Sequence, residues 1–555
     1  MNRDQHRTPQ ILLTVFFAGY FFIVEYLLIS KLSISSLTVF DYAVIAVISF
    51  LNLIPAGIFA FAVTSLLPIG SSTESDEEFL LGSFASNFKP RIAVLYATYN
   101  DFMPEHARYD LQQCRAGGLS FFILDDSSDL HKRSEIEKFS RECDCAVLRR
   151  PNRKGYKAGA INHWINIFGD SFDYFFILDS DSQASVKSIL YCAELARRNR
   201  KIGVVQTKTL TMTSSPSRLT RSSVCIQHAY MEIVQKAMKK LGTTPYYGHN
   251  ALVSVSAIKY VGGFVEESNE DYKTLARLHD RGYESLYAEN AVTWEEVPPD
   301  YLSSRKRSLR WSRDAVSQLG LLRYRNPLAI AFFLFYGWVT HISNLVLLML
   351  IFLTTTIALP HLFSNVPTEL AGVMALTVIF LWPLVALRTQ DPELKSGKML
   401  RALFWGSVYN IPMMAPLGVQ ILKTSIQKAW MRFCDLFGVQ LEVKQEFVVT
   451  PKTKNSNHSV SSIFRSLKTE TSFGIVLIVV AAASDHILSL VFAAPQVVAS
   501  FSVPLLVYAE SRGSSIREDK SSDQAVIPPE QVMLIKRPGD IYGTLTPFPT
   551  QLRVR

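Results

Sequence analysis

Two aspartates at the end of a predicted buried strand are the residues of this chain best placed to do chemistry. Residues 175–178 are apolar or aromatic, and the run is too short to cross a membrane, so it predicts a strand buried on both faces. Asp179 and Asp181 follow it directly. At such a strand end, both carboxylates can approach one divalent cation together with substrate phosphates. The alternative is structural, because aspartate is also common in helix caps and turns.

A second acidic pair and a basic run come earlier in the chain. The predicted strand 119–124 ends in Asp125 and Asp126, and the basic run 149–154 leads into a glycine-containing helix start that includes Lys157. Cations and backbone N–H groups at a helix start suit a diphosphate. On its own, the basic run is equally consistent with a solvated surface. Beside two acidic strand ends, a diphosphate-binding site is the favoured interpretation.

Strands and helices alternate through this part of the chain. Strands are predicted at residues 91–99, 119–124, 145–148 and 175–178, with helices at 104–115 and 131–143 and a third helix opening in the run 155–162. This alternation predicts a parallel, doubly wound α/β sheet.

These segments resemble the nucleotide-sugar-binding half of the family-2 glycosyltransferases. The resemblance is carried by residues 97–100, 125–127, 157–162 and 179–181. It implies an α/β GT-A (Rossmann-like) fold and a UDP-sugar donor. It also implies a role for each matching residue: the uridine would be lined by Thr98, Tyr99, Asp125 and Asp126, the diphosphate approached by Lys157, and the donor with Mg²⁺ or Mn²⁺ held by Asp179 and Asp181.

The second half of the domain continues the resemblance. Residues 269–271 match the family's TED motif, which implies that Asp271 is the general base, with Glu270 as its catalytic neighbour. In an inverting transfer, such a base takes the acceptor hydroxyl proton as the oxygen attacks the anomeric carbon. The alternative is that both are first-turn helix acids favoured by the helix dipole.

Residues 305–311 resemble the QxxRW motif of processive, membrane-integrated members, with Arg307 in place of the glutamine. The match implies that Arg310 pairs with the diphosphate and that Trp311 stacks on the acceptor sugar. A basic helix lying on anionic lipid is the alternative.

Further segments resemble particular branches of the family. Residues 248–251 and 295–299 resemble the osmoregulated periplasmic glucan glucosyltransferases (the glucans biosynthesis glucosyltransferase H type), which implies that His249 also belongs to the acceptor side. The chain is shorter than typical members of that branch. Residues 447–452 resemble the FxVTxK gating loop of cellulose-synthase-like enzymes, with Thr450 and Lys452 in the loop. A loop of this kind excludes water from the donor site; an ordinary edge strand is the alternative.

Apolar runs at both ends of the chain predict membrane spans. Residues 11–30 and 42–67 are each long enough to cross a bilayer, and Arg3 and Arg7 place the N-terminus inside. The net charge of +9 over 555 residues fits this positive-inside pattern better than nucleic-acid binding. The six cysteines fit a reducing compartment without a disulfide framework.

The remaining apolar runs complete the predicted organisation. Runs at 326–359, 370–387 and 473–508 predict further spans, about six in all, whereas residues 402–422 are broken by Pro412 and Pro416 and predict an interfacial helix. We therefore expect a transmembrane hairpin at 1–70, a cytoplasmic GT-A domain at 71–325, a transmembrane channel region at 326–509 with the interfacial helix and the gating loop, and a cytoplasmic tail at 510–555.

The sequence thus predicts a processive, inverting glycosyltransferase of the bacterial inner (cell) membrane, which polymerises a β-glucan from UDP-glucose and translocates it. Its expected partners are the UDP-sugar donor, the growing polysaccharide and membrane lipid, with a periplasmic accessory protein as a further candidate, and no nucleic acid. The alternatives are a non-processive transferase to a lipid carrier and a non-catalytic UDP-sugar-binding membrane sensor. Asp179, Asp181 and Asp271 argue against the sensor, which has no need of a base.

Overall fold

A computed structural model of the chain describes residues 3–30, 39–67, 89–213, 217–241, 244–267, 270–315, 396–437, 459–483 and 487–513. Several predictions concern residues outside these ranges. They are the spans within 326–387, the gating-loop residues Thr450 and Lys452, and most of the tail at 510–555.

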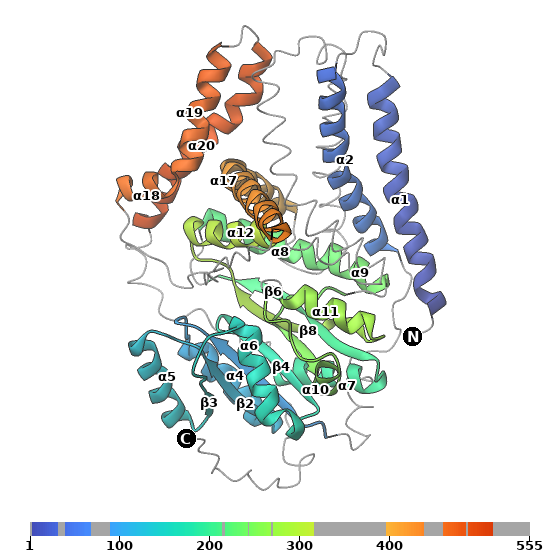
Figure 1. Ribbon diagram of the computed structural model, residues 1–555, viewed down its shortest axis with the longest axis vertical. Coiled ribbons are helices and arrows are strands. Elements are labelled where there is room, and N and C mark those ends of the chain that lie inside the picture. Colours follow the sequence, from blue (N-terminus) through green and yellow to red (C-terminus); the bar gives the residue numbers. More distant parts are fainter. Residues whose placement is uncertain are drawn as a thin grey trace.

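A mixed sheet of eight strands forms the centre of the α/β domain (Figure 1), in the order β3-β2-β1-β4-β7-β6-β8-β5. The strands are β1 (Ile92–Thr98), β2 (Ser120–Asp125), β3 (Ala146–Leu148), β4 (Tyr174–Asp179), β5 (Ser182–Ala184), β6 (Ile202–Met212), β7 (Ala251–Ser254) and β8 (Glu284–Glu296). The first four strands are parallel neighbours. They lie within two residues of the predicted strands.

The prediction of a wholly parallel sheet is wrong. Strand β7 runs antiparallel to both β4 and β6, and β5 runs antiparallel to β8. Strand β7 reverses direction because the chain enters it at the edge where β4 ends: the Asn250 N–H donates to the Ile177 carbonyl at 2.7 Å immediately before the pairing begins. The mixed sheet with its parallel first half is the GT-A-like arrangement that the resemblance implies.

Strand β4 is buried on both faces, as its apolar run predicts. Successive side chains of a strand point to opposite faces. Accordingly, Phe175 and Ile177 join the core formed with Trp164, whereas Phe176 and Leu178 join the core on the other face. Helices α4 (Pro104–Gly117), α5 (Leu130–Cys143) and α7 (Val186–Arg198) cover the second face, and helices α6 (Tyr156–Phe168), α10 (Val255–Tyr260) and α11 (Glu270–Asp280) cover the first.

Two helices at the N-terminus are long and apolar enough to cross a membrane. They are α1 (Arg3–Ser30) and α2 (Val39–Leu66), whose apolar segments are Thr8–Ser30 and Ile45–Leu66, and in the described part of the chain no other helix meets that test. The one carboxylate within these segments, Glu25, accepts hydrogen bonds from Ser49 at 2.6 Å and from Asn52 at 2.9 Å, both in α2. The polar groups that interrupt the two segments therefore form hydrogen bonds with one another.

The hairpin of α1 and α2 is attached to the α/β domain through a bent helix. This helix consists of α8 (Arg218–Tyr230), a π-helical turn η3 (Met231–Gln235) and α9 (Lys236–Lys240). Lys240 Nζ donates to the carbonyls of Ser65 at 2.7 Å and Thr64 at 3.1 Å, so it caps the C-terminus of α2. Phe61 of α2 packs against Ile233 of η3 in a small apolar cluster.

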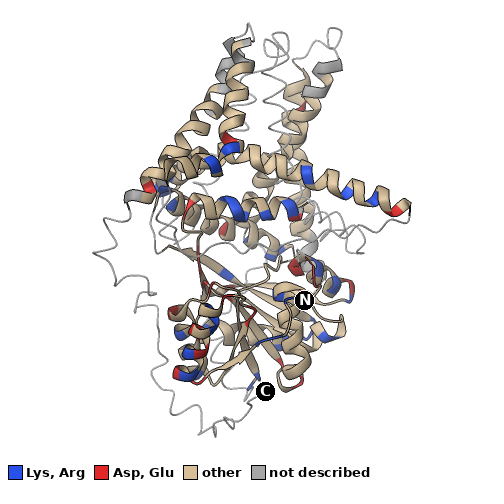
Figure 2. Cartoon of the chain, turned by 60° about the vertical axis from the view of Figure 1, so that its left-hand side comes forward, with Lys and Arg blue, Asp and Glu red and all other residues tan. Residues whose placement is uncertain are grey.

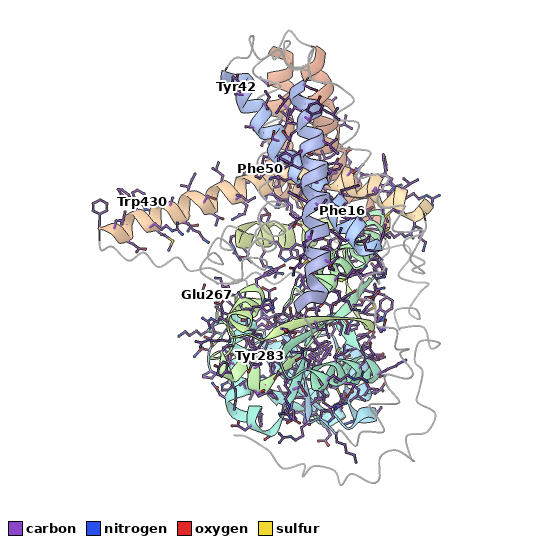
Figure 3. The ribbon with its side chains drawn as sticks, turned by 90° about the vertical axis from the view of Figure 1, so that its right-hand side faces the viewer. Phe16, Tyr42, Phe50, Glu267, Tyr283 and Trp430 are labelled. Atoms are coloured by element: carbon purple, nitrogen blue, oxygen red, sulfur yellow. The ribbon has the colours of Figure 1, made fainter. Side chains whose placement is uncertain are left out.

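Helix α17 (Ser396–Leu436) lies crosswise to α1 and α2, with Trp430 near one end (Figure 3). It includes the predicted interfacial segment and runs through both prolines. Above it stand α19 (Lys468–Ala483) and α20 (Ile487–Gly513), with the short α18 (Val460–Ser466) before them (Figure 1). Figure 2 shows most Lys, Arg, Asp and Glu residues on the α/β domain and on the helices directly above it.

Helix α12 (Tyr301–Ala315) joins the α/β domain to these upper helices. Arg305 forms a bidentate ion pair with Glu470 of α19, a side chain that is 1% exposed, and one of its contacts measures 3.2 Å. Tyr301 packs on Tyr409 of α17, with ring centroids 5.9 Å apart. All six cysteines are free.

Candidate active site

The donor side of the site is built at the carboxyl edge of the parallel strands. Asp179 is the last residue of β4, and Asp181 lies in the turn before β5. Lys157, in the first turn of α6, reaches Asp179, with its Nζ atom 3.1 Å from Oδ1. The loop before α6 packs so closely that a Cβ atom at Gly159 would lie 2.0 Å from the Lys154 carbonyl oxygen. The predicted basic helix start and the predicted acidic strand end therefore meet.

His249 adds a second cation to the donor side. Its Nε2 atom lies 2.5 Å from Glu295 Oε2, and its Nδ1 atom lies 3.8 Å from Asp179 Oδ2. Burial on its own would lower the pKa of His249. The negative charges of Asp179 and Glu295 outweigh that effect and raise the pKa to about 9. The imidazole is therefore positively charged at neutral pH.

The carboxylate predicted to be the general base lies on a separate element. Asp271 is in the first turn of α11, where its Oδ1 atom accepts a hydrogen bond from the Tyr272 N–H at 2.8 Å. Burial and the neighbouring charge of Glu270 raise the pKa of Asp271 to about 7, against the opposing effects of this hydrogen bond and of Lys157. A carboxyl group with this pKa is about half ionised at neutral pH, and its ionised form is a stronger base than an ordinary carboxylate, as a general base requires.

Gly248 lies between the donor side and the base. A Cβ atom at this position would lie 3.4 Å from Lys157 Nζ, 3.4 Å from Glu270 Oε1 and 3.5 Å from Asp271 Cβ. The glycine has a φ of +81°, a conformation that other residues rarely adopt. The backbone therefore approaches both sides closely, and it leaves space that any side chain would fill.

Helix α12 contributes the QxxRW-like residues. Burial lowers the pKa of Arg310, while the charges of Asp314, Asp179 and Glu270 oppose that effect, so the guanidinium lies within range of both sides of the site. Arg307 lies 4.8 Å from the centre of the Trp311 ring. Trp311 is 45% exposed, which leaves its ring accessible for stacking.

The four predicted uridine residues lie together at the ends of β1 and β2, where they contact their own neighbours. Asp125 pairs with Arg149 at 2.5 Å and Asp126 with Arg150 at 2.5 Å, contacts that leave the two carboxylates almost fully covered. The Arg153 guanidinium lies 3.3 Å from the centre of the Tyr99 ring. Thr98 donates to Asp101 at 2.9 Å.

The donor side offers the carboxylates of Asp179 and Asp181 to a divalent metal ion. In the described part of the chain, no group of three or more His, Cys, Asp and Glu side chains could hold a metal ion. Asp179 and Asp181 are therefore a pair of hard oxygen donors without a protein cage. This fits an ion such as Mg²⁺, which is usually bound by one or two carboxylates together with substrate phosphates and water.

Three residues near the reacting groups were not predicted as site residues. Glu295 contacts His249 from strand β8. In the sequence, its segment 295–299 indicated only a family resemblance. Asp314 follows Arg310 by one helical turn, a spacing that would have indicated the pair. Tyr246 is 1% exposed, and burial, together with the charges of Glu270, Asp271 and Asp179, raises its pKa well above the ordinary value. In the sequence, Tyr246 was indicated only by its position two residues before Gly248.

The arrangement defines a class of enzyme. A mixed α/β sheet brings two carboxylates and two cations to one edge, and a carboxylate with a pKa of about 7 faces them across a glycine. Cations offset the charge of a diphosphate leaving group, and such a carboxylate accepts a proton from an attacking hydroxyl. These are the requirements for group transfer from a nucleoside diphosphate.

Comparison with known proteins identifies the family that part of this chain resembles. Residues 174–387 match the family model described as Glycosyl transferase family group 2. The predicted resemblance to the family-2 glycosyltransferases is confirmed at that level. The matched segment begins at β4 and includes Asp179, Asp181, Asp271 and Arg310.

Two curated relatives are polysaccharide glycosyltransferases by name. A probable glucomannan 4-beta-mannosyltransferase 4 of Oryza sativa is 26% identical over 266 residues, which is 45% of this chain and 47% of the relative. The glucans biosynthesis glucosyltransferase H of Rhodopseudomonas palustris is 26% identical over 267 residues, 42% of this chain and 36% of the relative. The chain thus matches less than half the length of each.

Among solved structures, the mannosyltransferase PcManGT from Pyrobaculum calidifontis in complex with GDP-Man and Mn²⁺ superimposes with a TM-score of 0.46 at 14% identity. The match covers 69% of this chain and 99% of that one.

Proposed function

We propose that the protein is a membrane-bound, inverting glycosyltransferase that adds hexosyl units from a nucleoside diphosphate sugar to a growing β-linked polysaccharide. The observation that carries the proposal is the position of Asp271. Its carboxyl group, with a pKa raised to about 7, lies across Gly248 from the Lys157–Asp179 pair. One sugar ring placed over Gly248 would have the leaving group on one side and the base on the other.

The transfer follows from this arrangement. Asp271 takes the proton of the acceptor hydroxyl, and the hydroxyl oxygen forms a bond to the anomeric carbon. The bond from that carbon to the diphosphate oxygen breaks, and its electron pair leaves with the nucleoside diphosphate. Attack from the face opposite the leaving group inverts the configuration.

The donor side stabilises the charge that develops on the diphosphate. Lys157 and Arg310 bring positive charge to it, and Trp311 offers an exposed ring to the acceptor sugar. Asp179 and Asp181 would hold a Mg²⁺ or Mn²⁺ ion, which neutralises negative charge on the diphosphate when bound. Thr98, Tyr99, Asp125 and Asp126 are proposed to bind the uridine, with the two aspartates keeping their arginine partners.

UDP-glucose as donor, a β-glucan as product and export across the bacterial inner membrane are the finer parts of the proposal. The two apolar helices α1 and α2 support membrane attachment. We propose the cytoplasmic side for the α/β domain, from the positions of Arg3 and Arg7 before the first span. The name of the Rhodopseudomonas palustris relative supports glucose and a glucan, whereas the rice relative favours mannose as a second candidate. The channel, the lid with Thr450 and Lys452, and an accessory protein belong to the same proposal.

The test is product formation by the purified, detergent-solubilised chain with Mg²⁺ or Mn²⁺. UDP-glucose and GDP-mannose are supplied in parallel, and the Asp271→Asn variant serves as the matched control. A polymer that a linkage-specific β-glucanase digests, made by the wild type and lost in the variant, is the expected result. A product that stops at one sugar on a lipid indicates the non-processive alternative. Donor binding without turnover in either protein indicates the sensor and overturns the proposal.

A further inference from the structure

The turn at residues 247–250 carries Gly248 between the two sides of the candidate active site. Two of its residues have a left-handed backbone: Gly248 has a φ of +81° and Asn250 a φ of +52°. A residue with a side chain keeps this conformation only where its surroundings hold it there. Asn250 is fully buried, so the groups packed around it determine the shape of the turn.

One buried side chain contacts both the start and the end of this turn. Gln206, in strand β6, is fully buried, and its Oε1 atom accepts a hydrogen bond from the Tyr247 N–H at 3.2 Å. Its Nε2 atom donates to the carbonyls of His249 at 3.1 Å and Asn250 at 2.9 Å. The opposite orientation of the amide would place its oxygen against two carbonyl oxygens, which only accept hydrogen bonds. Every polar atom of the Gln206 side chain therefore serves the turn.

The sheet brings Gln206 to this position. In the pairing of β6 with β7, Gln206 lies opposite Ala251, the residue that follows the turn. The next residue of β6, Thr207, donates to the Asn250 carbonyl through its N–H group at 3.1 Å and through its hydroxyl at 2.7 Å. Strand β6 thus holds the end of the turn, and the Gln206 amide extends that hold back to Tyr247 at its start.

We infer that Gln206 is a positioning residue, which keeps Gly248 in place between the donor side and Asp271. The inference rests on the proposed function, because it takes the space over Gly248 as the place of the transferred sugar. A Cβ atom at Gly248 would lie 3.4 Å from Lys157 Nζ and 3.5 Å from Asp271 Cβ, so this space is narrow. A misplacement of about 1 Å costs on the order of 100-fold in rate. A turn that moves by that amount would obstruct the transfer.

Nucleotide binding does not depend on the same contacts. Lys157 is positioned by α6, and the four proposed uridine residues lie at the ends of β1 and β2. The His249 ring has its own contact with Glu295 of β8, at 2.5 Å. Loss of the Gln206 amide should therefore lower kcat and preserve the affinity for UDP. A residue needed only for stability would lower the unfolding midpoint and leave kcat of the folded enzyme unchanged.

The experiment compares the purified full-length chain with its Gln206→Met variant, which keeps the length of the side chain and removes its hydrogen bonds. Hydrogen–deuterium exchange is measured by mass spectrometry, and the peptide that contains residues 247–250 should exchange about tenfold faster in the variant. With a saturating sugar donor, kcat should fall by about tenfold to 100-fold. Calorimetry should give the wild-type affinity for UDP.

Two further variants test whether the reach of the amide matters. Gln206→Asn keeps an amide but is one methylene shorter, so it should behave like Gln206→Met, and it carries the same test if the methionine variant fails to fold. Gln113→Met is the matched control. The Gln113 Oε1 atom accepts a hydrogen bond from the Val186 N–H at 3.1 Å, where α4 meets α7, so its loss should change neither kcat nor the exchange of the turn.

Three outcomes overturn the inference. The turn may exchange in folded Gln206→Met as slowly as in the wild type, or it may exchange faster with kcat unchanged. In the third outcome, the affinity for UDP falls as far as kcat does. Failure of the proposed function looks different: a wild type that binds UDP and transfers no sugar refutes the enzyme, and the exchange measurement still decides whether Gln206 holds the turn.

Discussion

Replacing Glu270 by glutamine is expected to shift the acid limb of the pH–rate profile to lower pH. Asp271 acts only when ionised, so kcat/KM falls as the pH drops through its pKa. That pKa is raised from an ordinary 3.8 to about 7, and the charge of Glu270 is the second-largest cause after burial. Removing one neighbouring like charge lowers a pKa by on the order of one unit. The limb should therefore move from about pH 7 to about pH 6.

The magnitude can be read directly from the profile. One unit below its pKa, about a tenth of a carboxyl group is ionised, and at its pKa about half is ionised. At pH 6 the wild type should therefore keep roughly a tenth of its plateau rate, while Glu270→Gln keeps roughly half of its own plateau. The assay follows release of the nucleoside diphosphate at low donor concentration, so that kcat/KM is measured. The readout is the position of the limb, which a simple loss of activity does not change.

Two other variants test whether Asp271 is the group whose titration sets the acid limb. Asp314→Asn should shift the limb in the same direction by less, because the charge of Asp314 is the smallest of the effects on Asp271. Glu267→Gln is the matched control, since this exposed carboxylate pairs with Lys273 at 2.5 Å and is not among the charges that raise the pKa of Asp271. A limb that stays in place in Glu270→Gln, or that moves to higher pH, would show that Asp271 is not the group that titrates.

Three further predictions concern other parts of the structure. Lys157→Met removes the cation 3.1 Å from Asp179 and should weaken UDP binding by about tenfold or more, as measured by calorimetry. Gly248→Ala forces an alanine to a φ of +81° and should cost about 1–2 kcal/mol, seen as a lower midpoint in thermal unfolding. Glu470→Gln leaves Arg305 buried without its anionic partner and should cost about 3–5 kcal/mol. Asp170→Asn, at an ion pair whose aspartate is 95% exposed, should change the same unfolding midpoint little.

Local sequence pattern was sufficient for the first half of the α/β domain. The apolar run before Asp179 predicts a strand buried on both faces, and β4 is central in the sheet with a core on each side. The acidic strand ends and the basic helix start could be placed at one edge because parallel strands present their carboxyl ends together. The contact between Lys157 and Asp179 confirms that reasoning.

The second half of the sheet could not be predicted in this way. The direction of β7 depends on where the preceding segment crosses the sheet, and it is fixed by the bond from the Asn250 N–H to the Ile177 carbonyl. A four-residue strand carries no signal of its direction. The pairing of His249 with Glu295 is hidden for a related reason: the two residues are 46 positions apart, and they meet only because β7 and β8 both flank β6.

The helix that carries Arg310 connects the candidate active site to the upper helices of the molecule. Helix α12 lies between the sheet and the upper helices, where Arg305 is bound by Glu470 of α19 and Tyr301 packs on Tyr409 of α17 (Figure 1). The donor-side groups Asp179 and Lys157 come from the sheet edge instead. Because an inverting transfer needs the acceptor opposite the leaving group, a donor held at the sheet edge leaves the acceptor to approach along α12. On the proposed function, a growing polysaccharide would leave the site past Trp311, toward the helices that α12 contacts.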